Sequence, residues 1–279
     1  MGVVREAAGA LPRGVRRAGR AGARRRPVRR YVFQHRFGSA ARTLRKQIAD
    51  GTLGRALVGV CNTLWYRDHA YYDVPWRGRW ETEGGGPTMG HGIHQMDLML
   101  SLLGDWREVR ALMATLDRRV ETEDVSLAAV QFESGALVSM VNSILSPREE
   151  SYLRFDFTDA TVEVSHVYGY GNANWTWTPR KGVDERVAAG WRPTEDVNSS
   201  HAAQLADYLD ALDRGERPAV SGPDGRRSLE LITGLYQSAI TGRPVLRTDL
   251  EPGNPFYDHL DGGGRYTPGV FAGPTAEVA

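Results

Sequence analysis

The residues best suited to chemistry stand in one short segment, Gly84 to Asp97. It reads Gly-Gly-Gly-Pro-Thr-Met-Gly-His-Gly-Ile-His-Gln-Met-Asp, so three glycines precede two histidines and an acid. An imidazole of near-neutral pKa can take the proton of a hydroxyl group while hydride leaves the same carbon. We therefore assign His94 as the candidate general base, with His91 and Asp97 as candidate substrate contacts, although most histidines are structural.

Two of the glycines, Gly85 and Gly86, are candidate cofactor contacts. Glycines that enter a helix let an anionic group approach backbone N–H groups at the positive end of the helix dipole. Close packing of the helix through small residues explains them equally well. Gly84, Gly86 and Gly90 also match a loose dinucleotide fingerprint, which we reject because no parallel β-α-β unit with a ribose-binding acid follows.

The histidines and the cysteine give no pattern typical of a metal site. His91 and His94 form a His-x-x-His pair without a third ligand, and Cys61 is the only cysteine, so we predict neither a metal nor an internal disulfide. A single cysteine fits a reducing compartment, and the sequence shows no apolar run of signal-peptide or membrane-spanning type. We expect a cytoplasmic protein with no membrane partner.

A loop rich in rings and arginines, Arg67 to Glu83, precedes the glycines. Within it Tyr72, Trp76 and Arg77 are candidate substrate contacts, because rings stack on the apolar faces of sugars and guanidinium groups hold hydroxyls or a carboxylate. The same composition is typical of a subunit interface. The sequence leaves both uses open.

The elements around these residues must position them. The spacing of apolar residues predicts a helix from Pro87 to Leu103, which Gly104 ends, so that His94 lies in its first turns. Before it we expect a helix from Ser39 to Gly51, capped by Ser39, and a strand from Leu57 to Tyr66.

Several runs rich in β-branched and aromatic residues follow, and Glu133-Ser134-Gly135 predicts a hairpin turn between two of them. The runs are Val109 to Leu116, Val125 to Phe132, Leu137 to Ile144, Leu153 to Phe157, Thr161 to Ser165 and Trp175 to Thr178. Two later helices, Ala202 to Leu212 and Pro223 to Ala239, complete the layer. Because short turns join the strands, we predict an α+β fold: a mixed, mainly antiparallel open sheet with helices on one face and no complete Rossmann domain.

Composition divides the chain into three parts. Residues 1–30 are crowded with arginine among Gly, Ala and Pro, which predicts disorder more strongly than an RNA-binding arm or a transit peptide. Residues 31–249 have ordinary globular composition, and residues 250–279 form a Gly- and Pro-rich extended tail. The formal charge of +1 gives most of the molecule no reason to bind nucleic acid or acidic membranes.

Four segments carry a resemblance to the Gfo/Idh/MocA (glucose-fructose oxidoreductase / inositol dehydrogenase) family. They are "YVFQHRF", "WYRDHAYYDVPWRGRWETEGGG", "MGHGIHQMDLMLSLLG" and "HAAQLADYLDALDRGERPAVSGPDGRRSLELI". The resemblance runs from about Tyr31 to about Asp249 and identifies residues 31–249 as the family's substrate-binding and oligomerisation domain. It implies oxidation of a secondary alcohol on a sugar, cyclitol or related compound with NAD or NADP, with His94 on the family's catalytic histidine.

The sequence departs from this family pattern in two places. The dinucleotide-binding Rossmann domain, with its Glu-Lys-Pro lysine, has no counterpart: Lys46 and Lys181 are the only lysines, and neither lies in such a context. Gly90 stands where the family often has an acid, so His91 or Asp97 must compensate or the chemistry differs. We expect a truncated or frame-shifted member that binds no dinucleotide tightly by itself. The alternative is a non-catalytic polyol-binding or oligomer-assembly subunit.

The strands themselves predict self-association. Leu127 with Val130, and Val138 with Val141, place apolar side chains on both faces of the sheet. We expect the face without helices to pair with a second copy, giving a homodimer or a higher homo-oligomer that Leu127→Asp or Val138→Asp dissociates. The alternative is that the tail after Leu246 folds back over this face.

Overall fold

The structure is a computed structural model that describes residues 31–166 and 169–266. The predicted disorder of residues 1–30, and the last part of the predicted tail, lie outside the described residues. Within the described residues no helix is both long and apolar enough to cross a membrane.

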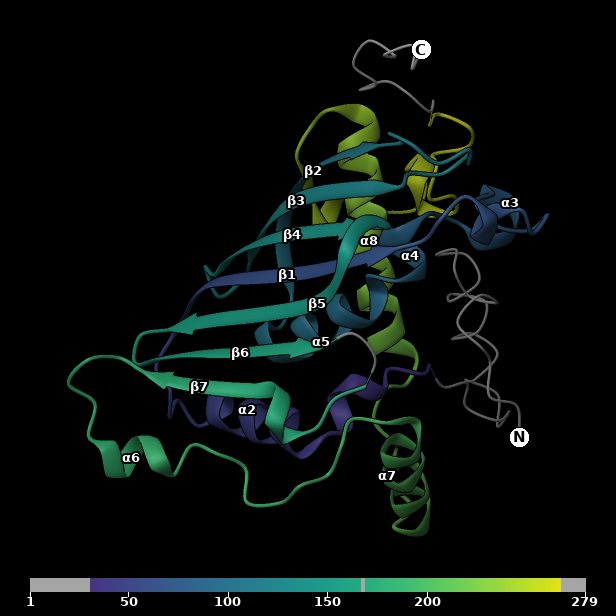
Figure 1. Ribbon diagram of the computed structural model, residues 1–279. Coiled ribbons are helices and arrows are strands. Elements are labelled where there is room, and N and C mark those ends of the chain that lie inside the picture. Colours follow the sequence, from purple (N-terminus) through teal and green to yellow (C-terminus); the bar gives the residue numbers. More distant parts are fainter. Residues whose placement is uncertain (1–30, 167–168, 267–279) are drawn as a thin grey trace.

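One open sheet of eight strands organises the described residues, in the order β7-β6-β5-β1-β4-β3-β2-β8 (Figure 1). The strands are β1 (Ala56–Tyr66), β2 (Trp106–Ala114), β3 (Val125–Phe132), β4 (Leu137–Ser143), β5 (Leu145–Phe157), β6 (Ala160–His166), β7 (Trp175–Pro179) and β8 (Val245–Leu246). Only the β1–β4 pair among these strands is parallel. The predicted mixed, mainly antiparallel sheet is therefore confirmed.

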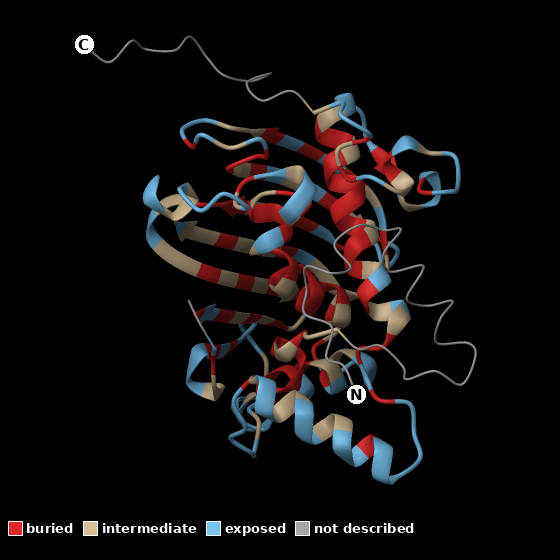
Figure 2. Ribbon diagram, turned by 90° about the vertical axis from the view of Figure 1, so that its right-hand side faces the viewer, coloured by how far each residue is buried: buried red, intermediate tan, exposed pale blue. Residues whose placement is uncertain are grey.

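Helices cover one face of this sheet and enclose the core (Figure 2). α5 (Ile93–Leu103) and α8 (Gly222–Thr241) contact each other and the strands, and α2 (Ser39–Ala49) joins them beside β7 through a hydrogen bond from Trp177 Nε1 to Gln47 Oε1 (3.0 Å). The remaining helices are η2 (Gln34–Phe37), η3 (Ala70–Tyr72), α3 (Trp80–Glu83), α4 (Pro87–Gly90), η4 (Asn172–Asn174), α6 (Glu185–Ala189), α7 (His201–Asp213), η5 (Arg247–Asp249) and η6 (Pro255–Tyr257).

The predicted single helix from Pro87 to Leu103 is wrong, because it breaks at His91 and Gly92 into α4 and α5. A Cβ at Gly92 would overlap the side chain of Asn142 on β4, so only glycine lets the backbone approach the sheet this closely. The amide of Gly92 donates to the carbonyl of Pro87 (2.8 Å), one residue further back than in a regular α-helix. His91 and His94 therefore belong to different helical segments.

The capping role predicted for Ser39 is also wrong. Gly38 is the N-cap residue of α2, and the Ser39 hydroxyl instead donates to Asn172 Oδ1 (2.9 Å) and accepts from the amide of Val197 (3.0 Å). The left-handed turn at Gly51, with φ of 74°, is as predicted.

α7 departs from the predicted layer on one face of the sheet. It contacts η2 near the edge of the fold, and Ala211 is its single buried residue (Figure 1). Leu205, Leu209 and Leu212 remain exposed along one stripe of this helix. The amphipathic pattern predicted the helix correctly, but the apolar stripe does not lie on the sheet.

The face of the sheet opposite the helices carries exposed apolar side chains. Val58 pairs with Leu137 and Leu112 pairs with Leu127 across neighbouring strands, and all four are about half exposed. Val138 points to the helical side and is buried, so the expectation that Val138→Asp acts at this face is wrong. Leu127 does lie on it.

The described part of the C-terminal tail packs against α8. Phe256 and Leu260 are buried, and Asn254 Nδ2 donates to Gln237 Oε1 on that helix (3.0 Å). Because Leu127 is still 49% exposed, residues up to 266 do not cover the open face of the sheet.

Candidate functional site

His94 lies at the start of α5, beside a cluster of aromatic side chains from distant parts of the chain. The ring of His35 meets it edge-on with centroids 5.7 Å apart, and Phe33 approaches from 6.3 Å. His35 in turn stacks on Tyr170 (5.0 Å) and lies 5.2 Å from His166. We call His35, His94 and His166 the histidine cluster.

Two hydrogen bonds fix the backbone of His35. Its carbonyl accepts from the hydroxyls of Ser199 (3.0 Å) and Tyr170 (3.3 Å). Burial, then the charges of His94, His166 and His201, lower the pKa of His35 well below its usual value. His35 is therefore a neutral ring at physiological pH, held against the candidate base.

His91 lies close to both α5 and the arginine-rich loop. Its ring meets Trp65 edge-on (5.1 Å), and the guanidinium of Arg67 lies 5.0 Å from the Trp65 ring centroid. Burial, and then the charges of Arg67, His94 and Arg77, lower the pKa of His91 to about 3. His91 is thus unprotonated at neutral pH and can serve as a hydrogen-bonding group but not as a cation.

Asp97 lies in the core, and substrate contact by this residue stays a prediction. Its side chain is fully buried and pairs with Arg36, which donates through Nε (2.6 Å) and Nη2. The hydroxyl of Ser228 on α8 donates to the same carboxylate (3.0 Å). Burial alone would lower the pKa of Arg36, but Asp97 and Asp224 outweigh it and raise that pKa. Asp97 fixes α5 to η2 and α8 from inside the core.

Glu123, which the sequence did not single out, binds the glycine segment. Its buried carboxylate accepts hydrogen bonds from the amides of Gly86 and Thr88, both 3.0 Å, and from the hydroxyl of Tyr236 (2.8 Å). A Cβ at Gly86 would overlap the Glu123 backbone, and one at Gly85 would overlap Tyr236. These contacts give both glycines a packing role, and cofactor contact by Gly85 and Gly86 stays a prediction.

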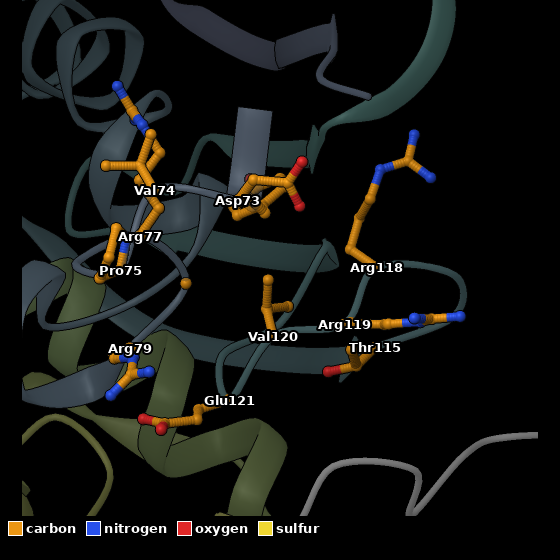
Figure 3. A pocket seen from close by; sticks show the side chains of 12 residues that line it. Asp73, Val74, Pro75, Arg77, Arg79, Thr115, Arg118, Arg119, Val120 and Glu121 are labelled. Carbon is orange, nitrogen blue, oxygen red and sulfur yellow. The ribbon is translucent and has the colours of Figure 1, made fainter. Parts of the chain in front are cut away.

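Two of the loop candidates, Trp76 and Arg77, contact each other. Arg77 lies 3.7 Å from the ring centroid of Tyr71 and 4.3 Å from that of Trp76, and it also contacts the Tyr71 hydroxyl. Trp76 is 48% exposed, so a ring face is free for a ligand. Tyr72 and Arg77 line a hollow of about 740 Å³ at the end of the sheet (Figure 3).

The site brings together the candidate base His94, the neutral ring of His35 packed against its edge, and His91, which lies beside Trp65 and near the loop arginines. This set suits a hydroxyl-rich ligand. The glycine segment offers a pyrophosphate no free amide at Gly86 or Thr88, because Glu123 already accepts both amide hydrogens. In the described part of the chain, no three metal-ligating side chains come together.

Comparison with known proteins identifies the class. Residues 41–164 match the sequence model of the GFO/IDH/MocA C-terminal domain. This match and the relatives described below support a Gfo/Idh/MocA family oxidoreductase.

Several characterised proteins are similar to this chain. D-glucoside 3-dehydrogenase of Escherichia coli (strain K12) is 25% identical over 240 residues, which cover 77% of this chain and 63% of that protein. D-apiose dehydrogenase of Rhizobium rhizogenes is 25% identical over 160 residues, covering 55% and 46%. The chain thus spans less than two thirds of the length of either relative.

A solved structure is also similar. The WlbA dehydrogenase from Bordetella pertussis, in complex with NADH and UDP-GlcNAcA, aligns with a TM-score of 0.75 and 26% identity. The alignment covers 88% of this chain and 71% of that protein.

Proposed function

We propose that this chain supplies the substrate side of an NAD(P)-dependent oxidoreductase that acts on a secondary alcohol of a sugar, cyclitol or related compound. The observation that carries the proposal is the position of His94 at the start of α5, against the neutral ring of His35 and near His91, which itself lies near the charges of Arg67 and Arg77. The similarity to D-glucoside 3-dehydrogenase and D-apiose dehydrogenase supports a sugar as the substrate.

In this proposal the imidazole of His94 takes the proton of the substrate hydroxyl. His35 packs against its edge and limits the orientations of the ring, while Arg77 and Trp76 hold the sugar. Because the amides of Gly86 and Thr88 are already bound by Glu123, we assign the dinucleotide pyrophosphate to a part of the protein outside the described residues. This chain contributes substrate binding and proton transfer.

The protein also assembles through its sheet in this proposal. The half-exposed apolar side chains of the face opposite the helices pair with the same face of a second copy. The same observation favours the second candidate function, a non-catalytic polyol-binding or oligomer-assembly subunit. A cytoplasmic location stays a prediction.

Turnover tests the role of His94. The chain is fused behind an NAD(P)-binding domain from another family member, and NAD(P)H formation is followed with glucosides, apiose, xylose and inositol. We expect His94→Ala to lower kcat about a hundredfold or more, as for loss of a general base. His259→Ala, at an exposed position, is the control and should leave kcat unchanged. Equal kcat in both variants would make His94 a structural residue.

A further inference from the structure

A row of buried polar side chains crosses the helical side of the sheet. Each member is the register partner of the next one on the neighbouring strand, from β3 through β4, β1 and β5 to β6 (Figure 1). We call it the polar row, and its members, none more than 7% exposed, are Ser126, Asn142, Thr63, Ser151 and His166. The adjacent row on the same side is apolar and consists of Ala128, Met140, Cys61, Leu153 and Val164. Polar groups beside such a row indicate specific contacts rather than core packing.

Two members of the polar row bind residues next to the candidate base. The hydroxyl of Ser126 accepts a hydrogen bond from Thr88 Oγ1 of α4 (2.7 Å). The hydroxyl of Ser151 accepts one from Trp65 Nε1 (3.1 Å). The ring of Trp65 in turn packs against His91. The row is therefore connected to the chain on the N-terminal side of α5.

The last member of the polar row belongs to the histidine cluster. The ring of His166 lies 5.2 Å from that of His35, and His35 packs against the edge of His94. The polar row thus has contacts both with the segment that precedes α5 and with the rings that surround the candidate base.

Asn142 is the member that contacts the break between α4 and α5. Its Nδ2 donates to the hydroxyl of Ser126 (3.2 Å), which fixes the orientation of the amide. Its Oδ1 is buried without a hydrogen-bond partner among the described residues and lies where a Cβ of Gly92 would stand. Gly92 has a φ of −67°, which any residue can adopt, so the Asn142 side chain and not the backbone requires glycine here.

The break determines the direction in which α5 presents its side chains. The amide of Gly92 donates to the carbonyl of Pro87, so this turn contains one residue more than a turn of regular α-helix. One extra residue rotates everything after it by about 100° relative to a continuous helix. A regular helix from Pro87 onward would therefore turn the ring of His94 away from His35.

We propose that Asn142 is a positioning residue for His94. By holding Gly92 against the sheet it maintains the break, and the break directs the His94 imidazole into the histidine cluster. The unpaired Oδ1 supports this role, because a buried acceptor without a partner costs stability and calls for a specific reason. The inference rests on the proton transfer proposed for His94.

The imidazole signals of His94 in ¹H–¹⁵N correlation spectra of the 279-residue chain test this inference without any turnover. Asn142→Ala should shift these signals while the chain stays folded, because Gly92 loses its contact. Thr233→Ala is the control, since it removes a buried hydroxyl that donates to the carbonyl of Leu229 within α8 (2.7 Å), and it should leave the signals unchanged. Unchanged His94 signals in Asn142→Ala would overturn the proposal.

Gly92→Ala tests the same contact from the other side. Its new Cβ would overlap Asn142, so the single variant should shift the His94 signals or fail to fold. Asn142→Ala makes room for that Cβ, so the double variant should bring folding and the signals back toward wild type. Gly90→Ala, where a Cβ meets open space, is the matched control and should leave the signals in place. A double variant as perturbed as Gly92→Ala would contradict the proposed contact.

Turnover of the fused protein separates positioning from substrate binding. Asn142→Ala should lower kcat about tenfold or more and change KM less than about twofold, because the base is misplaced while the sugar contacts remain. A raised KM with unchanged kcat would overturn the positioning role. If the His94 signals shift as expected but His94→Ala leaves kcat unchanged, the proposed function fails and the contact stands. If the signals do not shift, this inference fails whatever His94→Ala does.

Discussion

Two histidines three residues apart have different environments here. His94 lies in the first turn of α5 within the histidine cluster, whereas His91 is partly buried beside Trp65 at the backbone break, with its pKa lowered to about 3. Their spacing made both of them candidates. The two histidines differ because Trp65 packs on His91 and the charges of Arg67 and Arg77 lie near it.

The low pKa of His91 predicts how stability depends on pH. Between pH 3 and about 6.5 the unfolded state binds a proton that the folded state does not, so the free energy of unfolding falls as pH falls through this window. His35 acts in the same direction. His91→Gln should reduce the loss between pH 7.5 and pH 5 by about 2 kcal/mol, measured by urea unfolding. His259→Gln is the control, and a wild-type slope in His91→Gln would contradict the assignment.

At the residue scale, the sequence predicted the candidates that stand inside a recognisable motif. His94 and Arg77 were found because the glycine segment and the ring-rich loop mark them. The sequence analysis missed His35, Glu123 and Arg118. Their contacts are with residues that are far away in the sequence, at separations from 35 to 113 positions. A single buried acid before a strand gives no local signal.

At the scale of elements, α5 carries His94 and is anchored by a buried ion pair. Arg36 of η2 and Asp97 of α5 form two hydrogen bonds to each other, with Ser228 of α8 as the third partner. Removing one partner of such a pair leaves an uncompensated charge in the core. The position of His94 therefore depends on a buried ion pair between η2 and α5.

Asp97→Asn tests this anchor. We expect it to lower the free energy of unfolding by about 3–5 kcal/mol, because the guanidinium of Arg36 stays buried without its main counter-charge. Asp207→Asn removes the partner of Arg42 on the surface and should lower it by less than about 1 kcal/mol. Urea unfolding of both variants decides, and similarly small losses in the two would rule out an anchoring role for Asp97.

Element types were predictable to different degrees. The strands followed from β-branched and aromatic enrichment, and the hairpin at Gly135 has the positive φ of 89° that its glycine indicates. The break at His91 and Gly92 was not predictable, because its cause is the Asn142 side chain on a strand fifty residues later. Apolar periodicity continues across the break and conceals it.

On the scale of the whole molecule, the face of the sheet opposite the helices has an apolar part and a charged part. Its apolar side chains cross β1, β4, β3 and β2, where Leu127 lies opposite both Leu112 and Val141. The strands β5 and β6 instead present Arg154 and Glu163 to the same face. An interface between two copies would therefore centre on β4 and β3, with a charged margin.

Sedimentation velocity at micromolar concentration tests this interface. We expect a dimer or larger oligomer for the wild type and dissociation in Leu127→Asp, because the new charge would be desolvated between two sheets. Val187→Asp, at a 55% exposed position on α6, is the control and should leave the oligomer intact. Val138→Asp should unfold the chain instead, since Val138 is buried against the helices. A wild-type monomer of 30.8 kDa would contradict the proposed interface.

The central proposal is that this chain provides the substrate side of the reaction and binds no dinucleotide tightly by itself. Fluorescence titration of the 279-residue chain with NADH tests it most directly, with the fused protein that carries an NAD(P)-binding domain as the positive control. The account predicts saturable quenching for the fused protein and none for the chain alone. Saturable micromolar binding of NADH by the chain alone would contradict it.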